Sequence, residues 1–259
     1  MLEDEQIKIL TKREYLVVKG NELIQKSRFE LSLQEQKTIA YICSMIKPID
    51  TLDRINGVPF QLEYEFNIRD YCKVCGITYD SGKNYAEIKG TLKKLRDHSM
   101  WITLESGEET VVGWLDRVTT NKRSGVAKVR IDERLAPYLF DLGQKFTQYQ
   151  LYYILAMKSA FSVRIYEIMK SYAFQRFKTF HLDELKSLLM VDKVRAYEDF
   201  SLFRKKVLEV AQREINELTD LRFSYEPITK GRKVIKLNFL IEQKGLVERM
   251  NVQRMTKEN

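Results

Sequence analysis

Two stretches of the chain, residues 66–121 and 180–241, have sequence patterns that predict the same elements in the same order: a short helix, a turn, a basic helix and a β-hairpin. This order is typical of a winged helix, whose second helix enters the major groove of DNA. The sequence therefore predicts an α+β fold with two tandem winged-helix domains related by an internal pseudo-repeat. The two stretches share residue types in the same places and not residue identities.

The chain length supports this division, because 259 residues suit two domains of ordinary size that each bury a core. Gly143 ends a short helical pattern, and Thr147 has the side chain of a helix cap and predicts a helix to about Ser159. The expected parts are a flexible N-terminus over residues 1–14, an N-terminal domain over 15–143, a C-terminal domain over 147–242 and a tail over 243–259 that carries no recognisable motif.

The net charge indicates a polyanionic partner. Lys and Arg number 44 against 36 Asp and Glu, which gives a net charge of +8 and a pI near 9.2. Residues 1–146 hold 23 basic and 22 acidic side chains, whereas residues 147–259 hold 21 and 14, so the net charges are +1 and +7. If DNA is the partner, the C-terminal half should supply more of the attraction to phosphate. The alternative is an ordinary solvated basic surface.

Local patterns predict the first elements of the N-terminal domain. Residues 15–18 form a short apolar run typical of a strand. Ser32 and Glu35 have capping-box spacing and predict a helix over about 33–46. Residues 60–66 alternate between apolar and polar side chains, which indicates a half-buried strand.

A helix over residues 83–97 is the candidate recognition helix of the N-terminal domain. Ile88, Leu92 and Leu95 recur at helical spacing and predict its buried face. The opposite face then holds Lys83, Ala86, Gly90, Lys93 and Lys94. Three lysines and two small residues on one face would let the helix lie close to DNA, although many solvated helices have the same composition.

A helix that starts near Tyr197 and covers residues 200–219 is the candidate recognition helix of the C-terminal domain. The residues expected to face inward are Phe203, Val207, Val210, Ala211 and Leu218, and those expected to face outward are Ser201, Lys205, Gln212 and Asn216, flanked by Arg204 and Lys206. The N-terminal end of a recognition helix normally meets the base edges, and its amides attract phosphate. We therefore predict DNA contacts by Ser201, Arg204, Lys205 and Lys206.

Each candidate recognition helix is followed by a hairpin with a basic turn. The first hairpin, 116–130, has Lys122 and Arg123 at its expected tip, and the second has Lys230, Arg232 and Lys233. A basic turn between two strands suits contact with DNA phosphates. The two hairpins are the predicted wings.

The cysteines favour structural thiols. Cys72 and Cys75 have C-x-x-C spacing, but Cys43 is the one other cysteine, and His98 and His181 are the sole histidines, so a zinc site would need distant single residues. A thioredoxin-like motif opens a helix, whereas the following Gly76 predicts that this one ends a helix. We expect a reducing compartment, no metal and no cofactor.

The sequence predicts a cytoplasmic protein that does not contact a membrane. No apolar run approaches the ~18 residues needed to cross a bilayer. The N-terminal residues 1–5 are mostly acidic, unlike a signal peptide.

Catalytic motifs are absent as well, so no catalytic residues and no enzyme activity are expected. Enzymes that nick DNA at rolling-circle origins use a tyrosine and a metal held by two histidines one residue apart, and this chain has no such pair. The pairs Asp183-Glu184 and Glu198-Asp199 are explained by surface solvation. A phosphate-binding Gly-rich loop of the ATPase kind is missing.

Two motifs resemble the signatures of the iteron-binding bacterial plasmid replication initiators, the Rep family with two winged-helix domains. The first is Asn21-Glu22-Leu23-Ile24 with residues 29–37, and the second is Tyr197-Glu198-Asp199-Phe200 with residues 203–208, 214–216 and 219–220. The resemblance covers about residues 15–242.

The resemblance implies a monomer that binds repeated double-stranded origin sequences, mainly through the C-terminal domain. It also implies a dimer, joined through the N-terminal domain, that represses the protein's own promoter. A host replication initiator and the replicative helicase are the implied protein partners. A transcription repressor without an initiator role shares every DNA-binding feature and is the alternative, and an origin-nicking enzyme is a further one.

Overall fold

The computed structural model describes residues 11–79, 82–104, 106–143 and 145–258. The chain folds as two compact units, each discontinuous in sequence. Unit 1 comprises Met1–Leu23 and Gln34–Leu155, and unit 2 comprises Ile24–Leu33 and Ala156–Asn259. Two separate cores are therefore present, as the chain length predicts.

The boundary between the units lies after Leu155 and not near residues 143–147 as expected. Thr147 does not cap a helix but lies in the strand β8 (Phe146–Gln150), which pairs antiparallel with β1 (Leu16–Gly20). The Thr147 hydroxyl donates to Oδ1 of Asn21 at 2.6 Å. Helix α8 (Leu151–Ala156) then starts later than predicted. The strand pairing with β1 ties this segment to unit 1.

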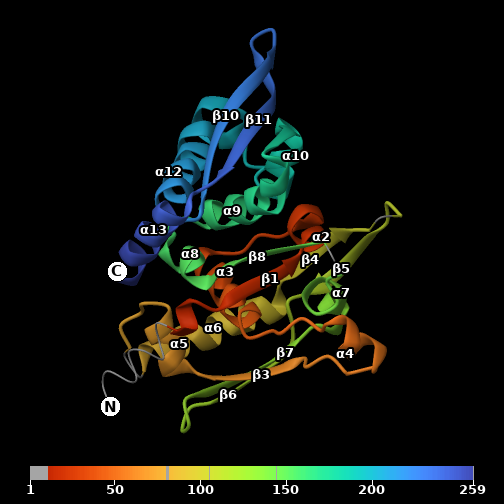
Figure 1. Cartoon of the computed structure of the whole chain (residues 1–259), viewed down its shortest axis with the longest axis vertical. Coiled ribbons are helices and arrows are strands. Elements are labelled where there is room, and N and C mark those ends of the chain that lie inside the picture. The colour runs from red at the N-terminus through yellow and green to blue at the C-terminus, as the bar shows by residue number, and fades with distance from the viewer. Residues whose placement is uncertain (1–10, 80–81, 105, 144, 259) are drawn as a thin grey trace. The chain divides into compact units, whose positions relative to one another are not determined.

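Unit 1 contains the first predicted winged helix. Its elements are α3 (Leu33–Cys43), β3 (Glu63–Asn67), α5 (Ile68–Val74), α6 (Lys83–Asp97), β6 (Leu115–Asn121) and β7 (Val126–Ile131). The strands form a sheet in the order β3-β7-β6, with Phe66 opposite Ala127 (Figure 1). The hairpin β6–β7 is called wing 1 below.

A second hairpin, β4 (Ser99–Thr103) with β5 (Glu109–Gly113), stands between α6 and wing 1. The first copy of the repeat therefore extends to residue 131 and includes an insertion, which the limits 66–121 did not anticipate. Trp101 on β4 is half exposed, whereas Trp114, between β5 and β6, is buried. The alternating burial along these strands follows from the two-residue period of a pleated strand.

Local chemistry explains the two ends of α5. The Asn67 side chain accepts the Arg69 backbone N–H at 2.8 Å and caps the start of the helix. Gly76, with φ of 68°, follows its end as the sequence predicts. Arg13 donates from Nε to the Val74 carbonyl at 2.7 Å. Residues 11–14 are therefore tied to α5, which differs from the expected flexible N-terminus, and residues 1–10 lie outside the described residues.

Unit 2 repeats this topology. Its elements are α9 (Ala160–Tyr172), β9 (Phe177–His181), α10 (Leu182–Leu188), a long helix over Phe200–Leu218, β10 (Leu221–Lys230) and β11 (Lys233–Gln243). The sheet order β9-β11-β10 corresponds strand for strand to β3-β7-β6. The predicted pseudo-repeat is thus confirmed. The hairpin β10–β11, called wing 2 below, extends past α10 and α12 in Figure 1.

Aromatic packing and one buried ion pair stabilise the core of unit 2. The ring centroids of Phe180 and Phe223 lie 6.0 and 5.8 Å from that of Phe239. Lys170 on α9 forms a buried ion pair with Asp220, and the Tyr166 hydroxyl donates to the same carboxylate at 2.8 Å. These contacts hold α9 against the turn that leads into wing 2.

The expected tail contains a helix, α13 (Leu246–Glu258). Val252 and Thr256 are buried, and Glu248 accepts a hydrogen bond from Arg222 of β10 at 2.6 Å. None of the helices in the described parts of the chain combines the length and the apolar character needed to cross a membrane.

Candidate nucleic-acid interface

The second recognition helix begins at Phe200. Asp199 has extended backbone angles, and its side chain accepts the Ser201 N–H at 2.7 Å. Tyr197 belongs to a separate 3₁₀ turn, η3 (Arg195–Glu198), so the helix starts three residues after Tyr197, and its limits of 200–218 agree with the predicted range of 200–219. The cap at Asp199 decides the start, because its side chain satisfies an N–H that lacks a partner within the helix.

A π-helical segment interrupts this helix. The chain runs as α11 (Phe200–Phe203), then π-helix η4 (Arg204–Leu208), then α12 (Glu209–Leu218). Leu208 and Ile215 are buried along this helix, whereas Val210 and Leu218, which were expected to face inward, are only partly buried.

Gln212 and Asn216 do not face outward as predicted. The side-chain amides of Gln212 and Asn216 donate to the Phe223 carbonyl at 3.1 and 3.0 Å, and the Phe223 N–H donates to Oδ1 of Asn216 at 2.8 Å. Both side chains therefore join α12 to β10. Gln212 and Asn216 therefore do not belong to the candidate DNA-facing surface.

Ser201, Arg204, Lys205 and Lys206 are all exposed near the start of the helix, as predicted. Nε of Arg204 lies 3.2 Å from Oε1 of Glu209. Lys205 and Lys206 make no ion pair with any residue in the described ranges. Within a single turn of the helix, the ammonium groups of Lys205 and Lys206 thus have no carboxylate partner in the described chain, whereas the guanidinium of Arg204 is paired with Glu209.

Wing 2 carries its cations at the tip. β10 ends at Lys230 and β11 begins at Lys233, and Gly231 between them has φ of 62°, a conformation that glycine adopts without strain. Lys230, Arg232 and Lys233 are exposed, and none pairs with a carboxylate of the described chain.

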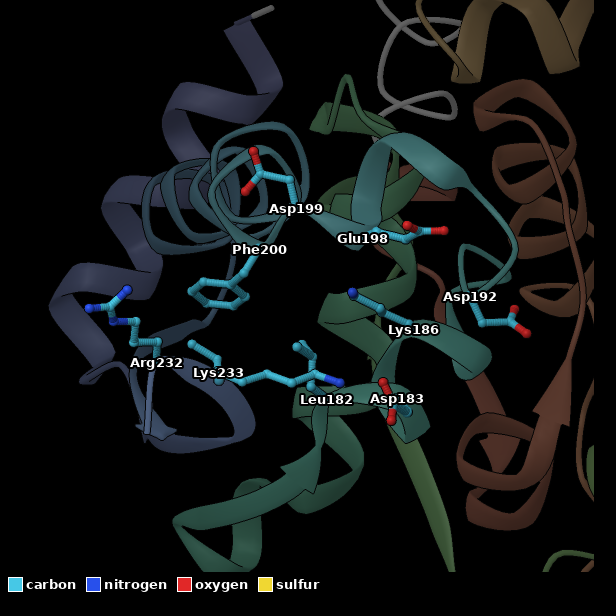
Figure 2. Close-up of a pocket in the computed structure, with 10 residues that line it drawn as sticks. Leu182, Asp183, Lys186, Asp192, Glu198, Asp199, Phe200, Arg232 and Lys233 are labelled. Carbon is cyan, nitrogen blue, oxygen red and sulfur yellow. The ribbon is translucent and has the colours of Figure 1, made fainter. Parts of the chain in front are cut away.

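A cavity of about 860 Å³ lies between wing 2, α10 and the start of the recognition helix. Four carboxylates line it, namely Asp183, Asp192, Glu198 and Asp199. Figure 2 shows Lys233 extending across the cavity toward Leu182 and Asp183, whereas Arg232 points away from it. Lys186, which also lines the cavity, donates to the Tyr197 carbonyl at 2.6 Å. Arg232 is therefore better placed than Lys233 to meet an external phosphate.

The first recognition helix, α6, has the predicted limits and the predicted buried face. Lys83, Lys93 and Lys94 are exposed, but two of them are paired. Lys83 lies 4.0 Å from Glu87, and Lys93 forms an ion pair with Asp97. The hydrogen bond from Lys93 lowers the pKa of the Asp97 carboxyl. Lys94 has no ion pair within the described residues.

Wing 1 is charged at its tip and neutralised along its strands. Lys122 and Arg123 are exposed in the turn, where Oδ1 of Asn121 accepts the Arg123 N–H at 2.9 Å. Three cations on the strands pair with three carboxylates: Arg117 and Arg130 with Glu63, Lys128 with Glu65, and Arg130 also with Asp116. The hydrogen bond to Glu65 raises the pKa of Lys128. The tip cations Lys122 and Arg123 are thus the ones in wing 1 that have no carboxylate partner in the described chain.

The cysteines and carboxylates that the sequence offers for redox, metal-binding or catalytic chemistry are accounted for by the fold. Cys43 and Cys72 are buried as expected, whereas Cys75 is partly buried, and desolvation raises the pKa of its thiol to about 12. Asp199 serves as a helix cap. Within the described ranges, no three His, Cys, Asp or Glu side chains are grouped so that they could hold a metal ion.

Comparisons with known proteins agree with the architecture. The family described as Initiator Replication protein, WH1, matches residues 16–170, and Initiator Rep protein, WH2, matches residues 181–241. A replication initiation protein of Escherichia coli is 26% identical over 238 residues, which span 88% of this chain and 70% of that protein. The crystal structure of the Pi initiator protein in complex with iteron DNA matches with a TM-score of 0.71 at 20% identity, over 90% of this chain and 99% of that chain. This last likeness shows a common fold.

Proposed function

Because the chain belongs to the initiator replication protein family, we propose that it initiates plasmid replication by binding repeated DNA sequences, iterons, at the origin. The observation that carries the proposal is the repeated placement of unpaired cations. In each unit, exposed cations lie on the recognition helix and at the tip of the hairpin, whose strands belong to a three-stranded sheet.

In the proposed mechanism, both units bind the same DNA duplex. The helices over residues 83–97 and 200–218 each enter a major groove, and the wing tips contact phosphates. Phosphate contacts supply affinity and depend on salt, whereas contacts to base edges supply sequence preference. Arg204, Lys205 and Lys206 have the side chains that most often contact guanine.

In this proposal the protein marks and opens the origin by binding, without covalent chemistry. A host replication initiator and the replicative helicase then act on the opened DNA, in the cytoplasm. A dimeric form, joined through unit 1, binds the promoter of the protein's own gene and represses it. The Pi initiator, which has the same fold, was solved with iteron DNA, and this supports double-stranded DNA as the ligand.

Footprinting on the DNA that flanks the gene tests the proposal. We expect several protected segments of related sequence, and we expect a plasmid that carries this DNA and the gene to be maintained in a host. Protection of the promoter without plasmid maintenance would favour a transcription repressor. Nicking of supercoiled DNA that carries the segments would contradict a mechanism without covalent chemistry.

A further inference from the structure

The π-helical segment η4 brings together two charged residues that an α-helix would separate. In an α-helix, residues five apart differ by about 140° around the axis. A π-helical turn closes through hydrogen bonds between residues five apart, and its wider turn brings these residues nearer to the same side of the helix. Arg204 and Glu209 are such a pair, and their Nε and Oε1 atoms lie 3.2 Å apart.

The contact leaves the base-reading part of Arg204 available. Glu209 contacts Nε, and among the described residues Nη1 and Nη2 of Arg204 have no hydrogen-bond partner. A guanidinium reads guanine through two parallel N–H groups, and it loses less freedom on binding when it is already held. The ion pair is about half exposed, so a duplex could reach it.

Three other residues bear on the role of the Arg204–Glu209 pair, namely Tyr225, Lys205 and Lys206. The charges of both residues act on Tyr225 of β10: burial raises the pKa of Tyr225, Glu209 raises it further and Arg204 lowers it. Lys205 and Lys206 follow directly in the chain and lack a carboxylate partner in the described part of the protein. Of the three candidate base readers, Arg204 is therefore the one with an ion-pair partner in the described part of the chain.

We propose that Glu209 is a positioning residue for sequence recognition, whose carboxylate holds Arg204 at Nε so that its outer N–H groups face a guanine edge. This inference rests on the proposed function. The same carboxylate repels phosphate, so contacts with unmatched DNA gain nothing from it. Glu209 thus increases the ratio of specific to random affinity.

A double-mutant cycle on the full-length protein tests the role. The probes are a duplex with one protected segment from the footprint and a scrambled duplex, titrated by fluorescence anisotropy at one salt concentration. We expect Glu209→Ala to weaken binding to the protected segment about 10-fold, within the range for one bidentate base contact, and to leave scrambled binding unchanged or tighter. In an Arg204→Ala background the same change should cause no further loss. Glu209→Gln, which keeps an acceptor oxygen, should restore part of the preference.

The matched control is Glu217→Ala, because Glu217 is an exposed carboxylate on the same helix without an ion pair in the described chain. We expect no change in sequence preference from this variant. Equal losses on both duplexes after Glu209→Ala, or a full additional loss in the Arg204→Ala background, would overturn the role of Glu209. Failure of the wild-type protein to distinguish the two duplexes would instead overturn the proposed function.

Discussion

At the scale of single residues, the partner of a cation decides whether it is available to DNA. Lys83 and Lys93 lie on the exposed face of α6 but pair with carboxylates one turn away. Lys94 and Lys205 have no such partner in the described ranges. Surface pairs contribute little to stability, but a phosphate must compete with the carboxylate for the same cation. The composition of α6 alone therefore overestimates how many of its cations are available to DNA.

At least one of Arg204, Lys205 and Lys206 should read a base. Replacing that residue by Ala should cost ~1 to 3 kcal/mol on the protected segment and much less on scrambled DNA, because the lost contact carries sequence information. Competition titrations of the three single variants measure this. Arg213, exposed farther along the same helix, is the control and should affect both duplexes alike. Proportional losses for all three variants would place sequence reading elsewhere, and the next candidates are Lys83, Lys93 and Lys94 of α6.

The buried carboxylate of Asp220 should matter for the stability of unit 2. Asp220→Ala leaves Lys170 without its partner and the Tyr166 hydroxyl without its acceptor, so unfolding free energy should fall by roughly 3 kcal/mol. Urea denaturation followed by circular dichroism measures the loss. Asp97→Ala removes an exposed ion pair of similar geometry and should leave the midpoint nearly unchanged. Equal shifts for the two variants would show that burial of the pair at Asp220 is unimportant.

At the scale of elements, the two wings share a topology but differ in the charge available to DNA. The strands of wing 1 carry Arg117, Lys128 and Arg130, each paired with a carboxylate. Wing 2 has three cations at its tip without carboxylate partners in the described chain. We infer that wing 2 contributes more phosphate attraction.

Replacement of Lys230, Arg232 and Lys233 by Ala should weaken binding to specific and random DNA by similar factors. The slope of log affinity against log salt should become shallower by roughly 0.9 per lost contact. Most of the effect should come from Lys230 and Arg232, because Lys233 extends across the cavity (Figure 2). Titrations at several salt concentrations measure the slope. Arg117→Ala is the control: a change of slope as large as that of Arg232→Ala would contradict the difference between the wings.

At the scale of the whole molecule, the two units should bind DNA unequally, because unit 1 has 21 basic and 21 acidic residues, net 0, whereas unit 2 has 23 and 15, net +8. Unit 2 includes Ile24–Leu33, where Arg164 donates to the Ser27 carbonyl at 2.8 Å and lies over the Phe29 ring. A fragment that starts at residue 147 would lack these partners. The comparison of the units therefore requires the full-length chain.

Two sets of four substitutions to Ala compare the units. The first set is Lys83, Lys94, Lys122 and Arg123 in unit 1, and the second is Lys205, Lys206, Lys230 and Arg232 in unit 2. We expect the second set to reduce affinity for the protected segment more, because unit 2 carries more of the net charge and its substituted cations are all unpaired in the described chain. Fluorescence anisotropy at one salt concentration decides the matter, and a larger loss for the unit 1 set would contradict the inequality.

The sequence by itself determined the class of fold, the repeat and the position of both basic wing tips. These features follow from short-range rules: apolar residues at helical or alternating spacing, Gly76 as the end of a helix, and glycines in tight turns. The buried face of α6 was predicted correctly for the same reason, because a regular 15-residue helix has one period throughout.

Only the tertiary structure decided features that depend on distant partners. Thr147 lies in a strand because β1 supplies a pairing edge, although its side chain suits a helix cap. Gln212 and Asn216 bind the backbone of β10, and the π-helical segment sets Arg204 beside Glu209. Local propensity contains no information about which edge, carbonyl or carboxylate the folded chain brings near a side chain. Tertiary contacts therefore determined which of the predicted cations stay available to DNA.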